Sequence, residues 1–202
     1  MKYKFKQKSS NVNPYLVVGV GGGACKAVME MMDAKLPGAM FACIDSDAET
    51  IGVLAPVLGS SAIQWRRERA PARLRSLARV LLADTRLLII VSTLGGYAGS
   101  TLAPYLARTA CEMEIPVAGV LTMPLDSELV ARHRTAQDGL WALRQLLQVH
   151  VVIDSKALLA SGRFNNKPVD KFFDAARTEM SHAVADIAQQ RQHLWSKLAS
   201  ET

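Results

Sequence analysis

The chain has 202 residues, half of them hydrophobic, which suits one globular domain with a substantial core. No uncharged apolar run is long enough to span a bilayer, and the N-terminus has no apolar stretch behind its charges, so we expect a soluble cytoplasmic protein. The net charge is +6, and the three cysteines lack the spacing of a metal site or a disulfide framework, which indicates free thiols in a reducing compartment.

Two segments carry most of the excess positive charge. Residues 1–13 form a basic tail that we expect to be flexible, and residues 14–200 are expected to fold as a single domain. Residues 65–79 hold six arginines and one glutamate. A solvated helix face is the commoner explanation of such a segment, and contact with an acidic surface, a nucleic acid or an anionic membrane is the functional alternative. No aromatic residues alternate with the arginines, which weakens the case for single-stranded nucleic acid.

The first predicted strand, over residues 16–20, runs directly into a glycine-rich turn and then into a helix that begins near residue 24. Glycines remove side chains that would block an anion and leave backbone N–H groups free to bind it, so the turn at residues 19–23 predicts a phosphate cradle. Close packing of the strand on the helix is the simpler alternative. A P-loop is excluded, because no Gly-Lys-Ser/Thr run occurs at the required spacing.

Two carboxylates follow the second predicted strand, over residues 40–44. Asp45 and Asp47 lie where they could hold a ribose hydroxyl or a magnesium ion. Asp47 is equally well placed to cap a helix over residues 48–54. Both explanations remain open from the sequence.

A second glycine-rich turn follows the strand predicted over residues 87–91. It spans residues 92–101 and leads into a helix over residues 102–111. Packing alone does not easily explain a second strand-to-helix turn of this kind in one domain. The next strand, over residues 117–121, exits through Pro124 and Glu128, and Arg132 lies one helical turn after Glu128.

A last strand is predicted over residues 150–153. Near-continuous apolar strands that alternate with helices indicate an α/β fold, with three layers in which a parallel sheet has helices on both faces, as in Rossmann-like domains. Ligands of such sheets bind beyond the carboxyl ends of the strands, where the two glycine turns and the carboxylates lie.

Several residues of types that often carry chemistry have simpler structural explanations. No nucleophile lies in a catalytic context near either central histidine, and helices that pack on a sheet need methionines and tryptophans in their core. We therefore expect structural or solvent-facing roles for His133 and His150, helix-core roles for Trp65 and Trp141, and core filling by Met29, Met31 and Met32.

In order and spacing, these turns resemble the nucleotide-binding domain of the FtsZ/tubulin family, from residue 14 to about residue 195. Residues 19–23 resemble the first phosphate loop of the family, residues 45–47 its Asn-Thr-Asp turn, and residues 95–101 its glycine-rich signature loop. The resemblance implies GTP or GDP as ligand, with Mg²⁺ as a possible companion, and a role in cell division or the cytoskeleton. It implies nucleotide contacts by Gly19, Gly21, Gly22, Gly23, Lys26, Asp45, Asp47, Gly95, Gly96, Gly99, Ser100, Thr101, Pro124, Glu128, Arg132, Phe173 and Arg177, and we assign no catalytic or metal-ligating residue.

The chain departs from the family pattern at informative positions. Tyr97 replaces a glycine of the signature loop, Asp45 replaces an asparagine, and Arg177 falls near the base-reading asparagine, while Phe173 could still stack on the base. The segment from residue 49 to residue 85 lacks the loop that senses the γ-phosphate in the family.

The sequence printed here also stops at Thr202, before the loop and second domain that family members use for hydrolysis, and the apolar residues of 183–198 are expected to pack on the same domain or on a partner. We therefore expect little or no GTP hydrolysis, and a role exercised through contacts with another protein, either an FtsZ/tubulin-like relative or a second copy. The alternative is a scaffold or regulator that docks on another protein without any nucleotide. A dinucleotide-dependent oxidoreductase ranks last, since no residues of a substrate domain support it.

Overall fold

A computed structural model describes residues 15–34, 36–66, 71–161 and 168–200. The predicted basic tail and part of the arginine-rich segment, residues 67–70, lie outside this range. The described helices are α1 (Gly22–Asp33), α2 (Ala48–Leu58), α3 (Pro71–Leu82), α4 (Ala103–Glu112), α5 (Val130–Arg144), α6 (Ser155–Ala160) and α7 (Val169–Ser200), with a 3₁₀ turn at Gly59–Ser61 and a π-helical turn at Ala98–Leu102 that leads into α4.

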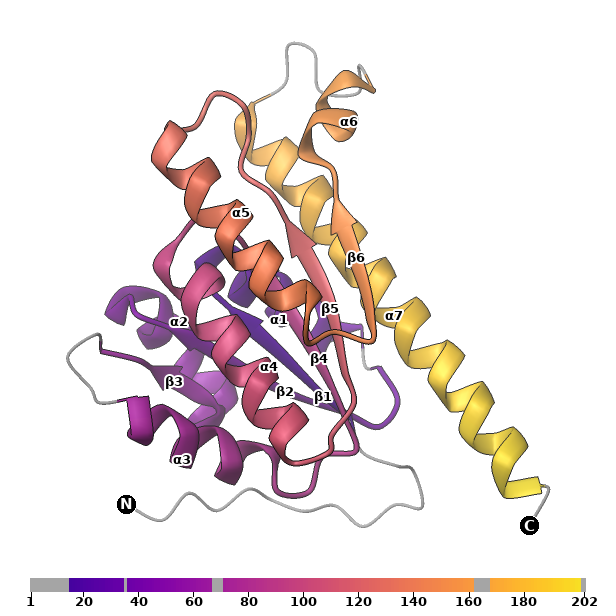
Figure 1. The fold of residues 1–202 in the computed structure, drawn as a ribbon. Helices are drawn as coiled ribbons and strands as arrows, with labels where there is room; N and C mark the ends of the chain where they lie inside the picture. The colour runs from indigo at the N-terminus through magenta and orange to yellow at the C-terminus, as the bar shows by residue number, and fades with distance from the viewer. Residues whose placement is uncertain (1–14, 35, 67–70, 162–167, 201–202) are drawn as a thin grey trace.

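The sheet is parallel throughout, and its strands follow the order β3-β2-β1-β4-β5-β6 (Figure 1). Its strands are β1 (Tyr15–Val20), β2 (Ala39–Asp45), β3 (Ala62–Gln64), β4 (Leu87–Thr93), β5 (Val117–Thr122) and β6 (Val149–Ile153). The five predicted strands are confirmed, and so is the α/β class. The sequence analysis missed β3, because three residues of an edge strand are too few to establish a period.

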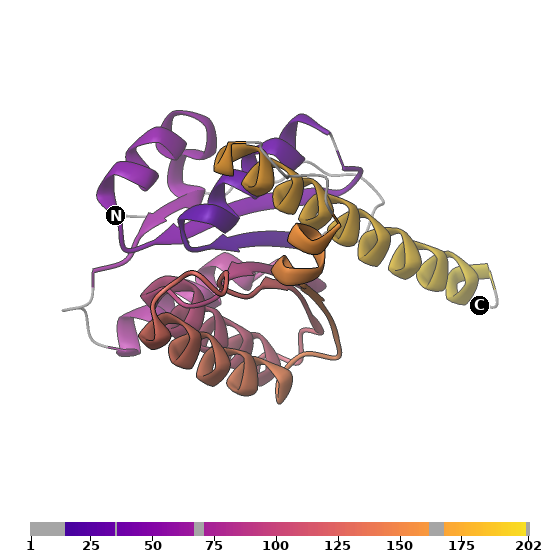
Figure 2. The ribbon, with the colours of Figure 1, turned by 90° about the horizontal axis from the view of Figure 1, so that it is seen from above.

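Helices cover both faces of the sheet, as predicted (Figure 2). Helices α3, α4 and α5 cover one face, where their apolar residues form a core cluster with Leu88 and Ile90. Helices α1, α2 and α7 cover the other, where they pack with Val17 and Ile89. The alternation of side chains along each strand supplies both clusters, which is why β1 and β4 are buried along almost their whole length.

The first half of α7 packs on its own domain. Met180 and Val184 are buried in the cluster shared with α1, and Ile187 is partly buried there. Self-packing is therefore confirmed for this part of the apolar stripe predicted over residues 183–198. The side chains of Leu194, Trp195 and Leu198 lie outside the described residues.

The two tryptophans that were expected in helix cores, Trp65 and Trp141, differ in their exposure. Trp65 is only 3% exposed and is a core anchor as expected, although it follows β3 and does not lie in a helix. The prediction for Trp141 was wrong, because this side chain is 70% exposed. Helix α5 turns Ala136 and Leu143 toward the sheet, and the helical period then places Trp141 on the outer side.

The structure also tests the roles expected for the methionines of α1 and for the two central histidines. Met31 is fully buried and Met29 packs against the same cluster, which confirms core filling by these two residues. Met32 is only partly buried and is not among the residues of that cluster. His133 is partly buried and hydrogen-bonds the Leu125 carbonyl oxygen at 2.9 Å, while His150 is exposed on β6. No helix in the described ranges is long and apolar enough to cross a membrane.

Candidate functional site

The strand order reverses between β1 and β4, and both glycine turns lie at this point. β1 pairs with β4 in the middle of the sheet, while the chain proceeds outward to β2 and β3 on one side and to β5 and β6 on the other. The helices that follow β1 and β4 therefore leave on opposite faces, α1 on one and α4 on the other. In open parallel sheets this is the point, beyond the carboxyl ends of the strands, where ligands bind. Both glycine turns thus lie at the carboxyl ends of the two central strands, where the sequence predicts the site.

The first turn is built around Gly21, whose φ of 96° disfavours other residues. Its amide donates to the Ile44 carbonyl oxygen at 3.0 Å, which ties the turn to β2. A methyl group at Gly21 would lie 3.2 Å from Thr93 Oγ1 and 3.5 Å from the Gly99 amide nitrogen. A methyl group at Gly23 would lie 2.8 Å from Thr93 Cγ2. The first turn therefore rests directly on the end of β4.

The second turn is equally tight. Gly95 has a φ of 97°, its amide donates to Ser100 Oγ at 2.9 Å, and a methyl group on it would lie 2.8 Å from Pro124 Cγ. A methyl group at Gly99 would lie 2.0 Å from the Thr93 carbonyl oxygen. The Ser100 hydroxyl is thus engaged within the turn, whereas Thr101 is exposed.

Close packing explains why most of these positions are glycine, but it does not explain Gly22 and Gly96. A methyl group at Gly96 would meet no atom within 4 Å, and one at Gly22 would make only ordinary contacts, 3.4 Å from Asp45 Oδ2 and 3.6 Å from Thr50 Oγ1. Gly19, in contrast, is required by the close approach of α1, since a methyl group there would lie 3.0 Å from the Ala24 carbonyl oxygen. Gly22 and Gly96 are therefore the positions where the turns have room for a ligand.

Tyr97 of the second turn contacts the core of one face. Its side chain is partly buried and packs against the apolar cluster beneath α3, α4 and α5.

The two aspartates after β2 have different roles. Asp47 is exposed and caps α2, accepting from the Thr50 amide at 2.8 Å and from the Thr50 hydroxyl at 2.7 Å. These hydrogen bonds, that of the hydroxyl first, lower the pKa of Asp47. Asp45 is 6% exposed, and its Oδ1 accepts from the Asp47 amide at 3.1 Å. Its other oxygen faces Gly22, so a negative charge lies beside the first turn.

The exit of β5 lies against the second turn. Glu128 accepts from the Leu125 amide at 2.9 Å and pairs with Arg132 Nε at 2.9 Å. The Arg132 carbonyl oxygen would lie 3.2 Å from a methyl group on Gly95. The structure thus brings Pro124, Glu128 and Arg132 to the same end of the sheet as the two turns.

The remaining predicted residues lie on α1 and α7. Lys26 is exposed on α1, and Phe173 is 45% exposed, with its ring edge-to-face against Phe172 at 5.5 Å between centroids. Arg177 pairs with Glu30 at 2.6 Å and also with Asp174. Glu30 lies about 12 Å along α1 from Gly22 at the helical rise, so Arg177 is held away from the glycine turns.

Three residues at the site were missed in the sequence analysis. Ser92 and Thr93 end β4 and separate the two turns, and the Ser92 hydroxyl lies 3.3 Å from the Val20 and 3.1 Å from the Gly99 carbonyl oxygen. Gly139 lets α5 approach the second turn, since a methyl group there would lie 2.8 Å from Ser100 Cα. The hydroxyl residues at the strand end were a usable signal, but the role of Gly139 depends on helix packing alone.

The thiols and carboxylates do not form a reactive centre. A hydrogen bond to the Cys43 thiol and burial raise the pKa of Cys25 far above its ordinary range, so this thiol stays protonated. Cys25, Cys43 and Cys111 are all free. Within the described ranges, no group of three or more His, Cys, Asp or Glu side chains is arranged to hold a metal ion.

Comparisons with known proteins identify relatives over most of this chain. No protein-family model matches the chain. The cell division protein FtsZ of Rickettsia felis is 32% identical over 154 residues, covering 70% of this chain and 34% of that protein. The FtsZ of Coxiella burnetii is 27% identical over 185 residues, covering 85% of this chain and 47% of that protein. The chain therefore spans about a third to a half of the length of these relatives.

Solved structures share the fold. An empty FtsZ dimer from M. jannaschii superposes with a TM-score of 0.75 at 21% identity, over 89% of this chain and 55% of that one. CetZ2 from Haloferax volcanii, in a protofilament with GTPγS bound, superposes with a TM-score of 0.69 at 14% identity, over 89% of this chain and 59% of that one.

Proposed function

Because most of this chain is homologous to the GTPase domain of the FtsZ/tubulin superfamily, we propose that it binds a guanine nucleotide, GTP or GDP, and acts through protein contacts in a cytoskeletal or division-related role. The observation that carries the proposal is the contact of the two glycine turns at the reversal of strand order, with open space over Gly96. Backbone amides and the positive end of α1 favour an anion there.

Two glycines and one aspartate of the site would determine how the nucleotide phosphates are held. Gly22 and Gly96 would lie against the phosphates. Packing within the protein does not explain why these two positions are glycine, because an added methyl group would meet no close contact at either. When bound, Mg²⁺ would neutralise phosphate charge. Asp45 is the buried carboxylate beside the first turn, and it would oppose bare phosphates unless a cation lies between them.

We further propose that hydrolysis is slow or absent. Phosphoryl transfer depends on donors and cations that stabilise charge on the transferred group. The two arginines of the predicted site are already engaged, Arg132 with Glu128 and Arg177 with Glu30 and Asp174. The charge of Asp45 at the first turn acts in the opposite direction.

The second candidate is a scaffold that docks on another protein without nucleotide. The same carboxylate favours it, since Asp45 Oδ2 would lie 3.4 Å from a methyl group on Gly22 and so places negative charge where a phosphate is expected. The fold would then support a protein contact surface alone.

Calorimetric titration of nucleotide-stripped protein with GTP, GDP and ATP in the presence of Mg²⁺ separates the two candidates. We expect the guanine nucleotides to bind, the Gly96→Asp variant to lose binding, and the matched Gly52→Asp variant to keep it. Both glycines have open space around them, but Gly52 lies on the exposed side of α2. Lack of binding to every nucleotide by the folded wild-type chain would favour the scaffold. Phosphate release at rates typical of efficient GTPases would contradict slow hydrolysis.

A further inference from the structure

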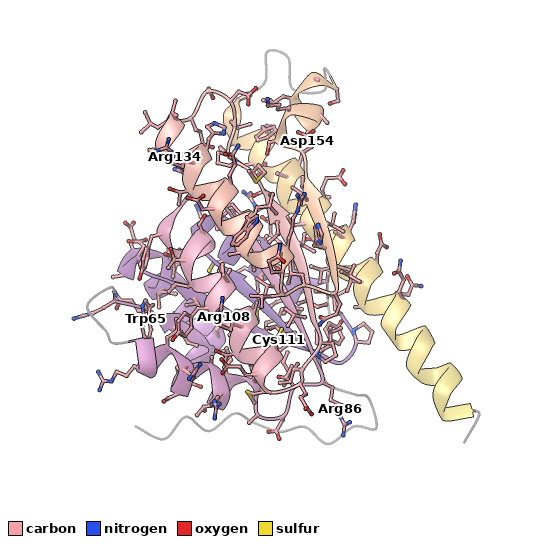
Figure 3. The ribbon with its side chains drawn as sticks, in the orientation of Figure 1. Trp65, Arg86, Arg108, Cys111, Arg134 and Asp154 are labelled. Atoms are coloured by element: carbon pink, nitrogen blue, oxygen red, sulfur yellow. The ribbon has the colours of Figure 1, made fainter. Side chains whose placement is uncertain are left out.

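The helical layer formed by α3, α4 and α5 exposes arginines on the side that faces away from the sheet (Figure 2). In sequence, these three helices hold seven arginines, no lysine and only two carboxylates, Glu112 and Asp138. Arg132 lies beside the second glycine turn, where it pairs with Glu128. We call the other six, all of them exposed, the arginine face: Arg73, Arg75, Arg79, Arg108, Arg134 and Arg144. Figure 3 shows Arg108 on α4 and Arg134 on α5.

The carboxylates of this layer neutralise little of its charge. Arg75 and Arg79 share the single carboxylate of Glu112, at 2.7 Å and 3.9 Å. This shared contact also joins α3 to α4, so the arginine face is continuous across the two helices. In the described part of the chain, the other members have no ion pair: Arg73, Arg108, Arg134 and Arg144. Their guanidinium groups can therefore bind an anion from outside the chain.

Apolar side chains stand among these arginines on α5. The outer side of this helix carries exposed residues that recur at the helical period, at i, i+4, i+7, i+11 and i+14: Val130, Arg134, Gln137, Trp141 and Arg144. Val130 is 83% exposed and Trp141 is 70% exposed, and Leu129, just before the helix, is 74% exposed. At the helical rise, Val130 and Trp141 lie about 17 Å apart along the axis. The helix therefore presents apolar side chains near both of its ends, with Arg134 between them.

We infer that the arginine face binds the surface of an anionic phospholipid bilayer. Guanidinium groups bind phosphate oxygens through two parallel N–H donors, which suits the phosphates of lipid headgroups. Tryptophan and aliphatic side chains that lie among basic residues enter the boundary between headgroups and acyl chains, and Val130 and Trp141 are placed to do so. The contact uses neither glycine turn, so it goes beyond the proposed nucleotide binding and is independent of it.

Two observations favour a bilayer over a nucleic acid or an acidic protein segment. Leu129 and Val130 carry no ring that could stack on a base, whereas acyl chains accept aliphatic side chains. Helices α3, α4 and α5 lie side by side, so at the usual spacing between packed helices the arginine face is about 20 Å wide (Figure 1). A lipid surface meets charges spread over such a width together, whereas one extended acidic segment would meet only a line of them.

Co-sedimentation of the nucleotide-free chain with lipid vesicles tests this inference. At about 0.1 M salt, the chain should bind phosphatidylcholine vesicles that contain about 30% phosphatidylglycerol at least tenfold more tightly than vesicles of phosphatidylcholine alone. Each arginine near such a surface strengthens binding by about fivefold, so Arg108→Glu with Arg134→Glu should weaken it by about 25-fold or more. The matched control, Lys156→Glu with Lys171→Glu, changes the net charge equally at exposed positions on α6 and α7. It should stay within about threefold of wild type, because charges off the arginine face are screened.

Quenching by brominated lipids tests whether Trp141 enters the bilayer, after circular dichroism has shown that each variant is folded. Anionic vesicles with bromine on the acyl chains should quench the tryptophan emission of wild type, and Trp141→Phe should lose most of this quenching because Trp65 is buried. The inference is overturned by a wild-type chain that does not bind anionic vesicles, by equal effects of the two double substitutions, or by quenching that persists in Trp141→Phe. Tighter binding to a single-stranded oligonucleotide than to the vesicles would overturn it in favour of nucleic acid. The Gly96→Asp variant should bind vesicles like wild type, which separates this result from the fate of the nucleotide proposal.

Discussion

The hydroxyl of Ser92 lies 3.1 Å from the carbonyl oxygen of Gly99, at the centre of the domain. Ser92 is fully buried at the end of β4, and the same hydroxyl lies 3.3 Å from the Val20 carbonyl oxygen just before the first glycine turn. One side chain therefore connects the two turns that form the candidate site.

Replacing Ser92 by alanine should remove this connection. Without the hydroxyl, neither buried carbonyl oxygen has this donor, so we expect a loss of about 1–2 kcal/mol in the free energy of unfolding. Urea unfolding measures the change. The matched control is Ser181→Ala, whose hydroxyl bonds Arg177 O one turn back in α7 and should contribute much less. Equal losses in the two variants would show that Ser92 has no special role.

Gly99 and Gly52 should respond in opposite ways to alanine. A methyl group at Gly99 would lie 2.0 Å from the Thr93 carbonyl oxygen, so Gly99→Ala should cost more than about 4 kcal/mol or prevent folding. Gly52 lies in α2 with no atom within 4 Å of the added methyl group, so Gly52→Ala should stabilise the protein by about 0.5–1 kcal/mol. Thermal unfolding measures both, and a Gly99→Ala variant as stable as wild type would contradict the tight packing of the second turn.

The Asp47 cap should make part of the stability depend on pH. The folded state lowers the pKa of Asp47, so its ionised form contributes stability above the unfolded pKa near about 4. That contribution is lost as the pH falls through the lower folded value. The difference in urea midpoint between wild type and Asp47→Asn should therefore be largest near neutral pH and shrink in acid. A difference that stays constant from neutral pH to below about 3 would show that the charge of this cap has no role.

Trp65 and Trp141 should differ sharply in their contribution to stability. Trp65 is 3% exposed, so Trp65→Ala should cost about 3–5 kcal/mol. Trp141 is 70% exposed, so Trp141→Ala should change stability by less than about 0.5 kcal/mol. Denaturant unfolding followed by circular dichroism compares them without relying on tryptophan emission. A large loss on Trp141→Ala would mean that this ring is covered in solution.

The sequence alone determined the fold class, five of the six strands in the described part of the chain, and the positions of both glycine turns. These features depend on local chemistry, because apolar runs that end in glycine-rich turns predict buried parallel strands. The sequence left open whether Asp47 caps a helix or contacts a ligand, and the structure shows the cap. The edge strand β3 escaped because it is short and is held by its pairing with β2.

The tertiary structure decided which glycines are needed for packing and which leave space. Gly21 faces Thr93 and Gly95 faces Pro124, each from another segment of the chain, and no local pattern predicts such distances. It also decided that Trp141 faces outward and that Arg177 is held by Glu30, since both results depend on how α5 and α7 are rotated against the sheet. The crossovers that send α3, α4 and α5 to one face and α1, α2 and α7 to the other are likewise a property of the tertiary structure.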